Sequence, residues 1–340
     1  MTETTTSHVR PVLSPWLQGQ LTTLLERRGH AWLLQGPSGL GQYTLGLELA
    51  RAWLCEAPTH QGACYQCRSC HAVDVRTHAD LRTLMPEALA LELKWPLDEK
   101  TQKELDDKKR KPSKEIRVEA ARDMVAFSQQ TRSGGSTKVV FVYPAERMNH
   151  VTANTILKTL EEPPGECRFV LASEAAHQLL PTIRSRCQTH TMVWPTEAEA
   201  LSWLQSQDVP ATDAAVLLRA AGGRPEDALD LANSGLKASH WAALPKAVLR
   251  GDVGAVSDAT PTQAIAMLQK LCHDLLALRS GAEPRFFMVA DLPSAGTVGS
   301  LTQWSKDLMD AARTSEHPYN AGLMFEALVA RAQTALRVKD

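Results

Sequence analysis

Four cysteines lie close together in the first quarter of the chain, at a spacing typical of a metal site. The pattern C-x8-C-x2-C-x2-C places them at Cys55, Cys64, Cys67 and Cys70. Two-residue gaps let consecutive sulfur atoms bind one ion, and Cys55 supplies a fourth thiolate for a tetrahedral shell. Such a shell leaves no coordination position for water. We therefore predict a structural zinc ion, Zn²⁺, held by these four residues.

Other interpretations of the cluster stay open at this point. His60 or His71 could replace one cysteine as a ligand. The thiols could instead form disulfides, or a Cys-x-x-Cys pair could act in redox chemistry, although three cysteines at short equal spacing favour a metal. The remaining cysteines are expected to be ordinary buried thiols: Cys167, Cys187 and Cys272.

A glycine-rich segment just before the cysteines has the outline of a phosphate-binding loop. In an active G-x-x-x-x-G-K-[ST] loop, backbone N–H groups surround the phosphates, the lysine reaches the β and γ oxygens, and the hydroxyl binds Mg²⁺. Gly36, Gly39 and Gly41 can make the turn, because glycine adopts positive φ angles easily. The lysine position is Gln42, however, and the hydroxyl position is Tyr43. An uncharged amide and a bulky phenol fit neither role, so we expect that this chain's own loop does not bind ATP.

The elements that must position these residues alternate between strands and helices. Apolar runs predict strands over 31–35, 138–143, 168–173 and 189–194, and helical periodicity predicts helices over 12–28, 44–55 and 152–160. A further helix is expected after Ser113, with Ile116, Ala120, Met124 and Phe127 facing inward. Such alternation implies right-handed crossovers and a mostly parallel sheet. We expect an α/β domain over 1–195, with the cysteine module inserted at 55–70.

Beyond Pro195 the sequence is helical throughout. Thr196 and Glu199 form a predicted capping box, and glycines at 222–223, 251 and 281 mark breaks between helices. We place a small helical domain at 196–240 and a second helical domain at 241–340.

Residues 98–117 are mostly lysine, aspartate and glutamate in mixed order. This composition predicts a solvated insertion that could be disordered. The basic run at 108–111 could contact nucleic acid, but the acidic residues beside it argue against a strongly basic patch.

Composition limits the classes of function. The net charge of −1 gives no global reason for strong nucleic-acid binding. Residues 1–8 lack the apolar core of a signal peptide, and no run approaches the roughly 18 apolar residues of a membrane helix. Together with the clustered cysteines, these features predict a cytoplasmic protein with no membrane contact.

Two motifs in the first half of the chain identify a family. Residues 152–164, TANTILKTLEEPP, and residues 183–187, IRSRC, occur together with a cysteine insertion after the loop helix. This combination resembles bacterial clamp-loader AAA+ subunits. The resemblance covers essentially the whole chain, although its specific motifs lie between 31 and 190. It implies an AAA+ parallel-sheet domain, a helical lid over 196–240 and a helical collar, the oligomerisation domain, over 241–340.

The resemblance also implies a role for one arginine. In this family ATP lies at subunit interfaces, and the arginine of the Ser-Arg-Cys motif completes the ATP site of the neighbouring subunit. Arg186 is therefore the candidate catalytic residue, a trans arginine finger. Arg184 could take this role instead, and Arg186 could simply be a surface arginine in a salt bridge.

The function implied by the resemblance is that of a loader subunit without ATPase activity of its own. It would join tau/gamma and delta subunits in a hetero-oligomeric ring, donate Arg186 to a tau/gamma site, and help to place the sliding clamp on primed DNA during replication. One alternative is an active AAA+ ATPase of the tau/gamma type, which Gln42 and Tyr43 disfavour. Another is an independent zinc-dependent DNA-binding module, which the near-neutral charge disfavours.

Overall fold

The computed structural model describes residues 13–133, 137–314 and 320–338 of the chain. Its residues divide into two compact units, Met1–Pro195 and Thr196–Asp340. The polar residues 1–8 and the first position of the helix expected over 12–28 lie outside the described residues.

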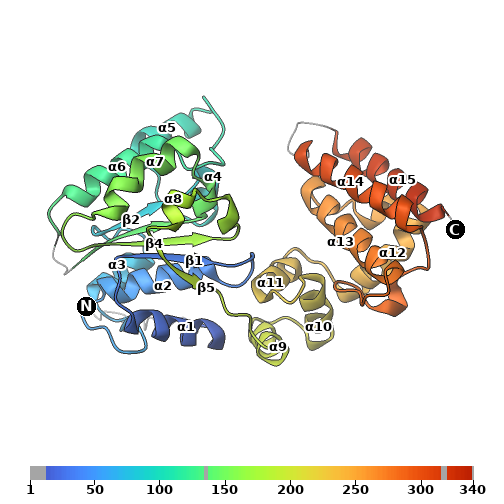
Figure 1. The fold of residues 1–340 in the computed structure, drawn as a ribbon, viewed down its shortest axis with the longest axis horizontal. Helices are drawn as coiled ribbons and strands as arrows, with labels where there is room; N and C mark the ends of the chain where they lie inside the picture. Colours follow the sequence, from blue (N-terminus) through green and yellow to red (C-terminus); the bar gives the residue numbers. More distant parts are fainter. Residues whose placement is uncertain (1–12, 134–136, 315–319, 339–340) are drawn as a thin grey trace, which may run out of the picture. The chain divides into compact units, whose positions relative to one another are not determined.

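The first unit is built on a five-stranded sheet in the order β2-β3-β4-β1-β5 (Figure 1). Every pair of neighbouring strands is parallel, which confirms the predicted parallel sheet. The central strands are almost wholly buried, as expected when helices cover both faces. The strands are β1 (Ala31–Gln35), β2 (Leu81–Leu84), β3 (Lys138–Val142), β4 (Cys167–Ser173) and β5 (Gln188–Thr191).

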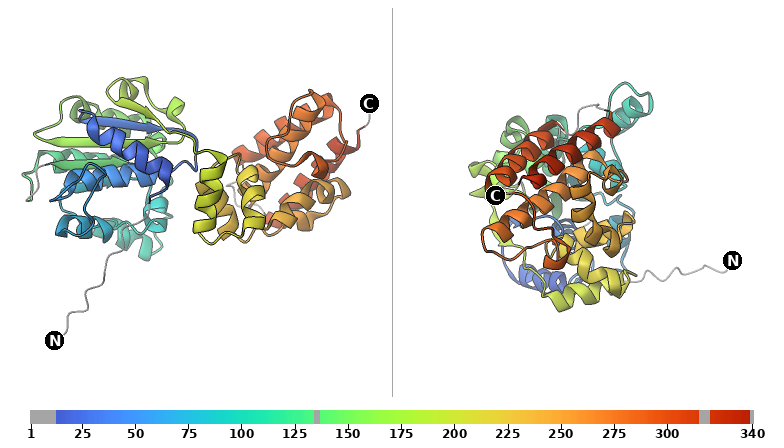
Figure 2. Two further views of the ribbon diagram at one scale, coloured as in Figure 1. Left: turned by 90° about the horizontal axis from the view of Figure 1, so that it is seen from below. Right: turned by 90° about the vertical axis from the view of Figure 1, so that its right-hand side faces the viewer.

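Helices cover both faces of this sheet, as Figures 1 and 2 show. One face carries α1 (Pro15–Glu26) and α2 (Gln42–Leu54), and the other carries α6 (Val118–Gln129) and α7 (His150–Glu161). Helix α2 passes close to β3 because Gly46 has no side chain: a Cβ there would lie 2.5 Å from the ring of Phe141. The shorter helices of this unit are α3 (Arg68–Asp74), α4 (Glu87–Glu92), α5 (Glu99–Asp106) and α8 (Pro181–Arg184), with 3-10 turns η1 (Ala145–Arg147) and η2 (Ala176–Gln178).

Strand β2 and helix α6 differ from what the sequence indicates. Strand β2 has no clear sequence signal, because its four residues, Leu-Arg-Thr-Leu, form neither an apolar run nor an alternating pattern. Helix α6 begins later than expected: Ile116 precedes it and forms a parallel bridge with Met148, and Ala121 rather than Ala120 is fully buried in the core.

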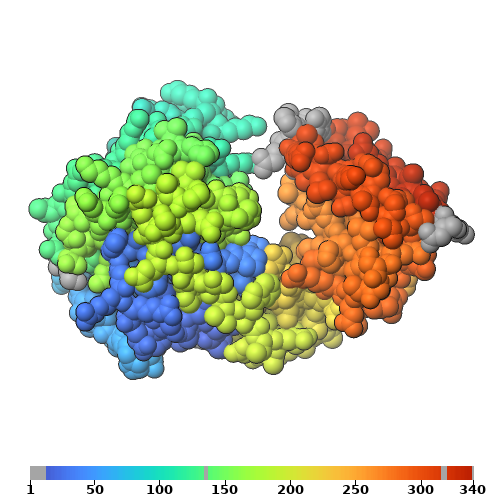
Figure 3. Space-filling model, viewed as in Figure 1, coloured from blue at the N-terminus to red at the C-terminus, as the bar shows by residue number. Residues whose placement is uncertain are grey.

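The charged segment is also more structured than predicted. Residues 99–106 form helix α5, which Asp98 caps by accepting a 2.9 Å hydrogen bond from the N–H of Thr101. Arg110 then forms ion pairs with Glu87 and Glu104. The expectation that this segment could be disordered is therefore wrong, because its own charges pair with each other and with α4. The segment lies on the surface of the first unit, in teal in Figure 3.

The second unit is entirely helical in its described part. Its helices are α9 (Glu197–Ser206), α10 (Ala211–Ala220), α11 (Pro225–Asn233), α12 (Ala238–Arg250), α13 (Pro261–Arg279), α14 (Val298–Thr314) and α15 (Ala321–Arg337), with 3-10 turns η3 (Val253–Ala255) and η4 (Val289–Asp291). The predicted capping box of Thr196 and Glu199 is present, and the glycines at 222, 223, 251 and 281 have positive φ angles.

Two hydrophobic cores occupy the second unit. Residues of α9 to α11, such as Leu204, Leu217 and Ala228, form the smaller core. Residues of α12 to α15, such as Trp241, Leu268 and Trp304, form the larger one. Among the described residues, no helix is both long enough and apolar enough to cross a membrane.

Candidate metal site and phosphate loop

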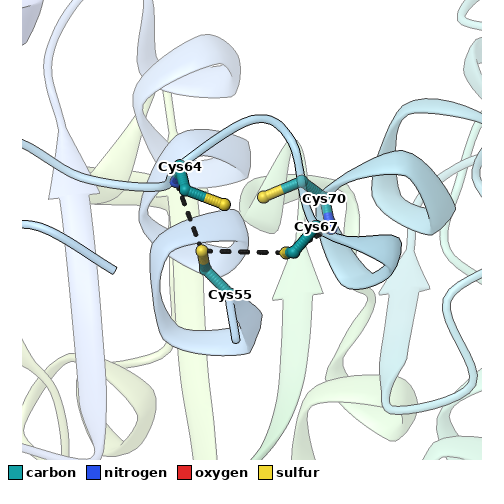
Figure 4. Close-up of side chains that lie close together, drawn as sticks. All are labelled: Cys55, Cys64, Cys67 and Cys70. Atoms are coloured by element: carbon teal, nitrogen blue, oxygen red, sulfur yellow. Dashed lines mark hydrogen bonds between the residues drawn. The ribbon is translucent and has the colours of Figure 1, made fainter. Parts of the chain in front are cut away.

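The four cysteines converge on one point. Cys55 follows the end of α2, Cys64 and Cys67 lie on the turn before α3, and Cys70 lies in α3; their sulfur atoms point toward one another (Figure 4). All four lie within 4.8 Å of each other, and Cys55 Sγ is 3.9 Å from Cys67 Sγ. A tetrahedral zinc site with Zn–S bonds of about 2.3 Å requires S···S distances of about 3.8 Å. The group could therefore hold a metal ion with little adjustment.

Backbone N–H groups support the sulfur atoms. Cys64 N donates to Cys55 Sγ at 3.2 Å, Gln66 N to Cys64 Sγ at 3.5 Å, and Cys70 N to Cys67 Sγ at 3.3 Å. The hydrogen bond from Gln66 lowers the pKa of the Cys64 thiol to about 7, whereas burial raises the pKa values of Cys55 and Cys70. Several thiolates buried close together are favoured when a bound cation offsets their charge.

Among the described residues, the convergent group contains cysteines alone. His60 and His71, which were considered as rival ligands, are both exposed and lie outside it. All seven cysteines are free thiols. Cys167 and Cys272 are buried as expected, and Cys187 is partly buried.

A buried polar network attaches the cysteine module to α2. Arg51 is 4% exposed and bonds to Glu48, to the carbonyl of Cys70 and to Asp74 of α3. The hydroxyl of Tyr65 donates to Glu48 at 2.6 Å. Because Arg51 bonds directly to the backbone of Cys70, the network fixes the position of that cysteine relative to α2.

The glycine-rich loop adopts the predicted turn. Gln42, at the position of the lysine in an active loop, forms hydrogen bonds with the loop itself. Gly39 and Gly41 have φ angles of 73° and 90°. Gln42 is 2% exposed, and its Nε2 donates to the carbonyls of Gly36 at 2.8 Å and Pro37 at 2.6 Å. A lysine in an active loop extends toward phosphate oxygens. The amide of Gln42 instead turns back and closes the loop.

Tyr43, at the position of the Mg²⁺-binding hydroxyl, belongs to an aromatic cluster. Its hydroxyl accepts a 2.8 Å hydrogen bond from Trp95 Nε1. Its ring centroid lies 5.7 Å from that of Phe141 and 5.2 Å from that of Tyr143. We call these four residues the aromatic cluster. It places bulky rings beside the start of α2, where an active loop needs a small hydroxyl and a hydrated metal ion.

The carboxylate after β3 is also engaged. Glu146 of η1 accepts a 2.7 Å hydrogen bond from the hydroxyl of Ser173, at the end of β4, and a 3.1 Å bond from the N–H of Glu174. In an AAA+ ATPase these two strand ends carry the acid that binds Mg²⁺ and a polar sensor residue. Here the carboxylate of Glu146 and the hydroxyl of Ser173 bond to each other.

Arg186 lies at the surface just after α8. Its Nε and Nη2 donate to Glu161 Oε2 at 3.0 and 2.8 Å, and its Nη1 donates to the carbonyl of Thr182 at 3.0 Å. The side chain of Arg186 is 29% exposed. Its ion pair with Glu161 is the surface salt bridge that the sequence left open as an alternative. Arg184 is exposed as well.

Comparison with known proteins gives this arrangement a family. A family model described as "DNA polymerase III, delta subunit" matches residues 17–194, more than half of the chain. The DNA polymerase III subunit delta′ of Pseudomonas aeruginosa is 37% identical over 227 residues, which cover 66% of this chain. This chain belongs to the delta-prime family. The described fold agrees with the predicted architecture: a parallel five-stranded sheet, a group of four cysteines and a helical C-terminal region.

Other delta-prime proteins match over similar lengths. The Escherichia coli subunit is 34% identical over 224 residues, or 64% of this chain. The matched segments span 62% of the Pseudomonas and 60% of the Escherichia relative. Among solved structures, a DNA polymerase III gamma subunit-related protein from Thermotoga maritima covers 94% of this chain and 99% of its own, with 18% identity and a TM-score of 0.46.

Several contacts around the glycine-rich loop and the cysteine module could not be predicted from the sequence. Trp95 is separated from Tyr43 by 52 positions and lies outside any motif, so its hydrogen bond had no sequence signal. Glu48 and Arg51 resembled ordinary polar positions of a helix. Their (i, i+3) spacing was visible, but their burial was not.

Proposed function

We propose that this chain is a clamp-loader subunit that does not hydrolyse ATP itself and that donates Arg186 to the ATP site of a neighbouring subunit. The neighbour would be a tau/gamma subunit, in a hetero-oligomeric ring that also contains delta subunits. The ring would place a sliding clamp on primed DNA, in the cytoplasm. The family membership supports the assembly, and the site geometry supports the division of roles.

The observation that carries the proposal is the pair of hydrogen bonds that the Gln42 side chain donates within the loop. Its amide has no charge to offer a phosphate, and both of its described donor bonds go to the loop's own carbonyls. The aromatic cluster and the bond between Glu146 and Ser173 support the same conclusion, because they occupy the groups that would otherwise bind Mg²⁺. A chain with this loop would contribute to ATP hydrolysis through a side chain that it donates to the site of a neighbouring subunit.

Arg186 is suited to that contribution. Its guanidinium is partly exposed, and an arginine supplied in trans stabilises the charge that develops on the transferred phosphoryl group. Such an arginine raises the rate by about 10³- to 10⁵-fold in GTPases activated by a partner protein.

Two measurements test this proposal. Calorimetric titration of the metal-loaded chain with Mg·ATP should detect no binding. In a reconstituted loader with clamp and primed DNA, Arg186→Ala should lower ATP turnover at least about tenfold, because charge on the phosphoryl group is left uncompensated. Arg184→Ala is the matched control and should have a much smaller effect. Micromolar ATP binding followed by turnover in the isolated chain would instead indicate an active ATPase.

We also propose that the cysteine group holds a structural zinc ion. The four-sulfur donor set and the S···S distances support zinc, since soft thiolates in a closed tetrahedral shell leave no site for a substrate. Cys67→Ser should reduce the metal content from one ion per chain to well below one, measured by atomic emission. Cys272→Ser, a buried thiol outside the group, is the control and should retain the metal.

A further inference from the structure

We propose that Glu161 is a positioning residue that orients the guanidinium of Arg186 toward an acceptor outside the chain. This inference rests on the proposed function of Arg186. It assigns a role to Glu161, to which the proposed function gives none. It is based on which N–H groups of Arg186 bond to the described residues and which do not.

A guanidinium has five N–H bonds in a planar fork. In Arg186, Nε and Nη2 each use one on the same oxygen of Glu161, and Nη1 uses one on the carbonyl of Thr182. These three bonds involve three different nitrogens and hold the plane of the fork. Within the described part of the chain, one N–H on Nη1 and one on Nη2 remain, and a phosphate accepts such a pair in the bidentate geometry that arginine favours.

The location of Glu161 supports a role other than helix stability. It is the last residue of α7, and a carboxylate at the C-terminus of a helix is repelled by the partial negative charge there. The side chain of Glu161 is 56% exposed, so burial does not determine its position either. What it contacts is Arg186, across 25 positions of sequence.

Orientation matters because an arginine finger acts only when its donors meet the phosphoryl oxygens. Without Glu161, the long side chain of Arg186 would sample several rotamers, and only part of this population would be competent for catalysis. This loss lowers kcat more than it changes the KM for ATP, because ATP is bound mainly by the neighbouring subunit.

The test is ATP turnover by the complete loader with clamp and primed DNA. Glu161→Gln, which keeps the shape of the side chain and removes its charge, should lower kcat about 3- to 10-fold with KM for ATP nearly unchanged. Glu161→Ala should lower kcat further. Glu162→Gln, one position along the chain at an exposed glutamate, is the matched control and should match the wild type.

A double-mutant comparison separates positioning from general structure. If Glu161 acts through Arg186, then Glu161→Ala should cause no further loss in an Arg186→Ala background. A further loss there, failure of the Glu161 variants to assemble, or wild-type turnover by Glu161→Ala would each overturn the inference. If Arg186→Ala alone leaves turnover unchanged, the proposed function fails as well. Loss with Arg186→Ala and none with Glu161→Ala would reject only the role of Glu161.

Discussion

Gln42 does the opposite of what a lysine at its position would do. A lysine holds the loop open around a phosphate by attracting it, whereas the amide of Gln42 bonds to Gly36 and Pro37 within the loop. The side chain thus replaces the stabilisation that a bound phosphate would give to the loop. At the scale of single residues, these two bonds support the proposal that the loop is a closed structural turn rather than a nucleotide-binding site.

This view of Gln42 makes a prediction for stability. Gln42→Ala removes a buried donor from two carbonyls, so it should lower the free energy of unfolding by about 1–2 kcal/mol. Urea denaturation followed by tryptophan fluorescence measures the change. Gln129→Ala, at an exposed position of α6, is the control and should be nearly neutral. An unchanged midpoint for Gln42→Ala would show that the two bonds do not stabilise the loop.

At the scale of elements, Glu87 explains why the charged segment is ordered. This carboxylate at the start of α4 is 8% exposed, accepts hydrogen bonds from Arg110 and from the N–H of Ser113 at 2.8 Å, and forms an ion pair with Arg117. This carboxylate therefore attaches the segment from α5 to α6 to helix α4. The composition of the segment favoured disorder because composition gives only the number of charged residues. It does not show which of these charges form pairs in the fold.

Glu87 also predicts a pH dependence. Burial raises its pKa, but the bonds from Arg110 and Ser113 and the charge of Arg117 outweigh burial, and the pKa lies below its usual value of 4.5. A carboxylate with a depressed folded-state pKa stabilises the fold above its unfolded-state pKa, and this contribution is lost as the pH falls through the folded-state value.

Glu87→Gln should therefore lower the free energy of unfolding by about 1–3 kcal/mol at pH 7. The difference from the wild type should shrink as the pH falls below 4.5, which urea denaturation across a pH series would measure. Glu92→Gln, at an exposed position of the same helix, should have little effect at any pH. A difference that is independent of pH would contradict the role assigned to the Glu87 charge.

At the scale of the whole molecule, the proposed metal site lies in one unit only. The cysteines and the Arg51 network lie in Met1–Pro195, whereas Thr196–Asp340 has its own hydrophobic cores. Since metal binding is coupled to folding, its removal should affect the two units differently.

We expect a zinc chelator to increase hydrogen exchange in residues 48–74, measured by mass spectrometry, and to leave helices α13 to α15 as protected as before. Re-addition of Zn²⁺ should restore protection. Equal loss of protection in both units would show that the metal stabilises more than its own module.

The sequence by itself determined the parallel α/β architecture, the close spacing of the four cysteines, and the absence of the lysine and the small hydroxyl of an active phosphate loop. These depend on local patterns: apolar strand runs, two-residue cysteine gaps, and the residue types at positions 42 and 43. Only the tertiary structure decided what replaced the lost chemistry. The bond of Tyr43 to Trp95, the bond of Ser173 to Glu146 and the pair of Arg186 with Glu161 join residues that are far apart in the chain. Which side chains meet across such separations is set by how the helices pack on the sheet, and no local pattern records it.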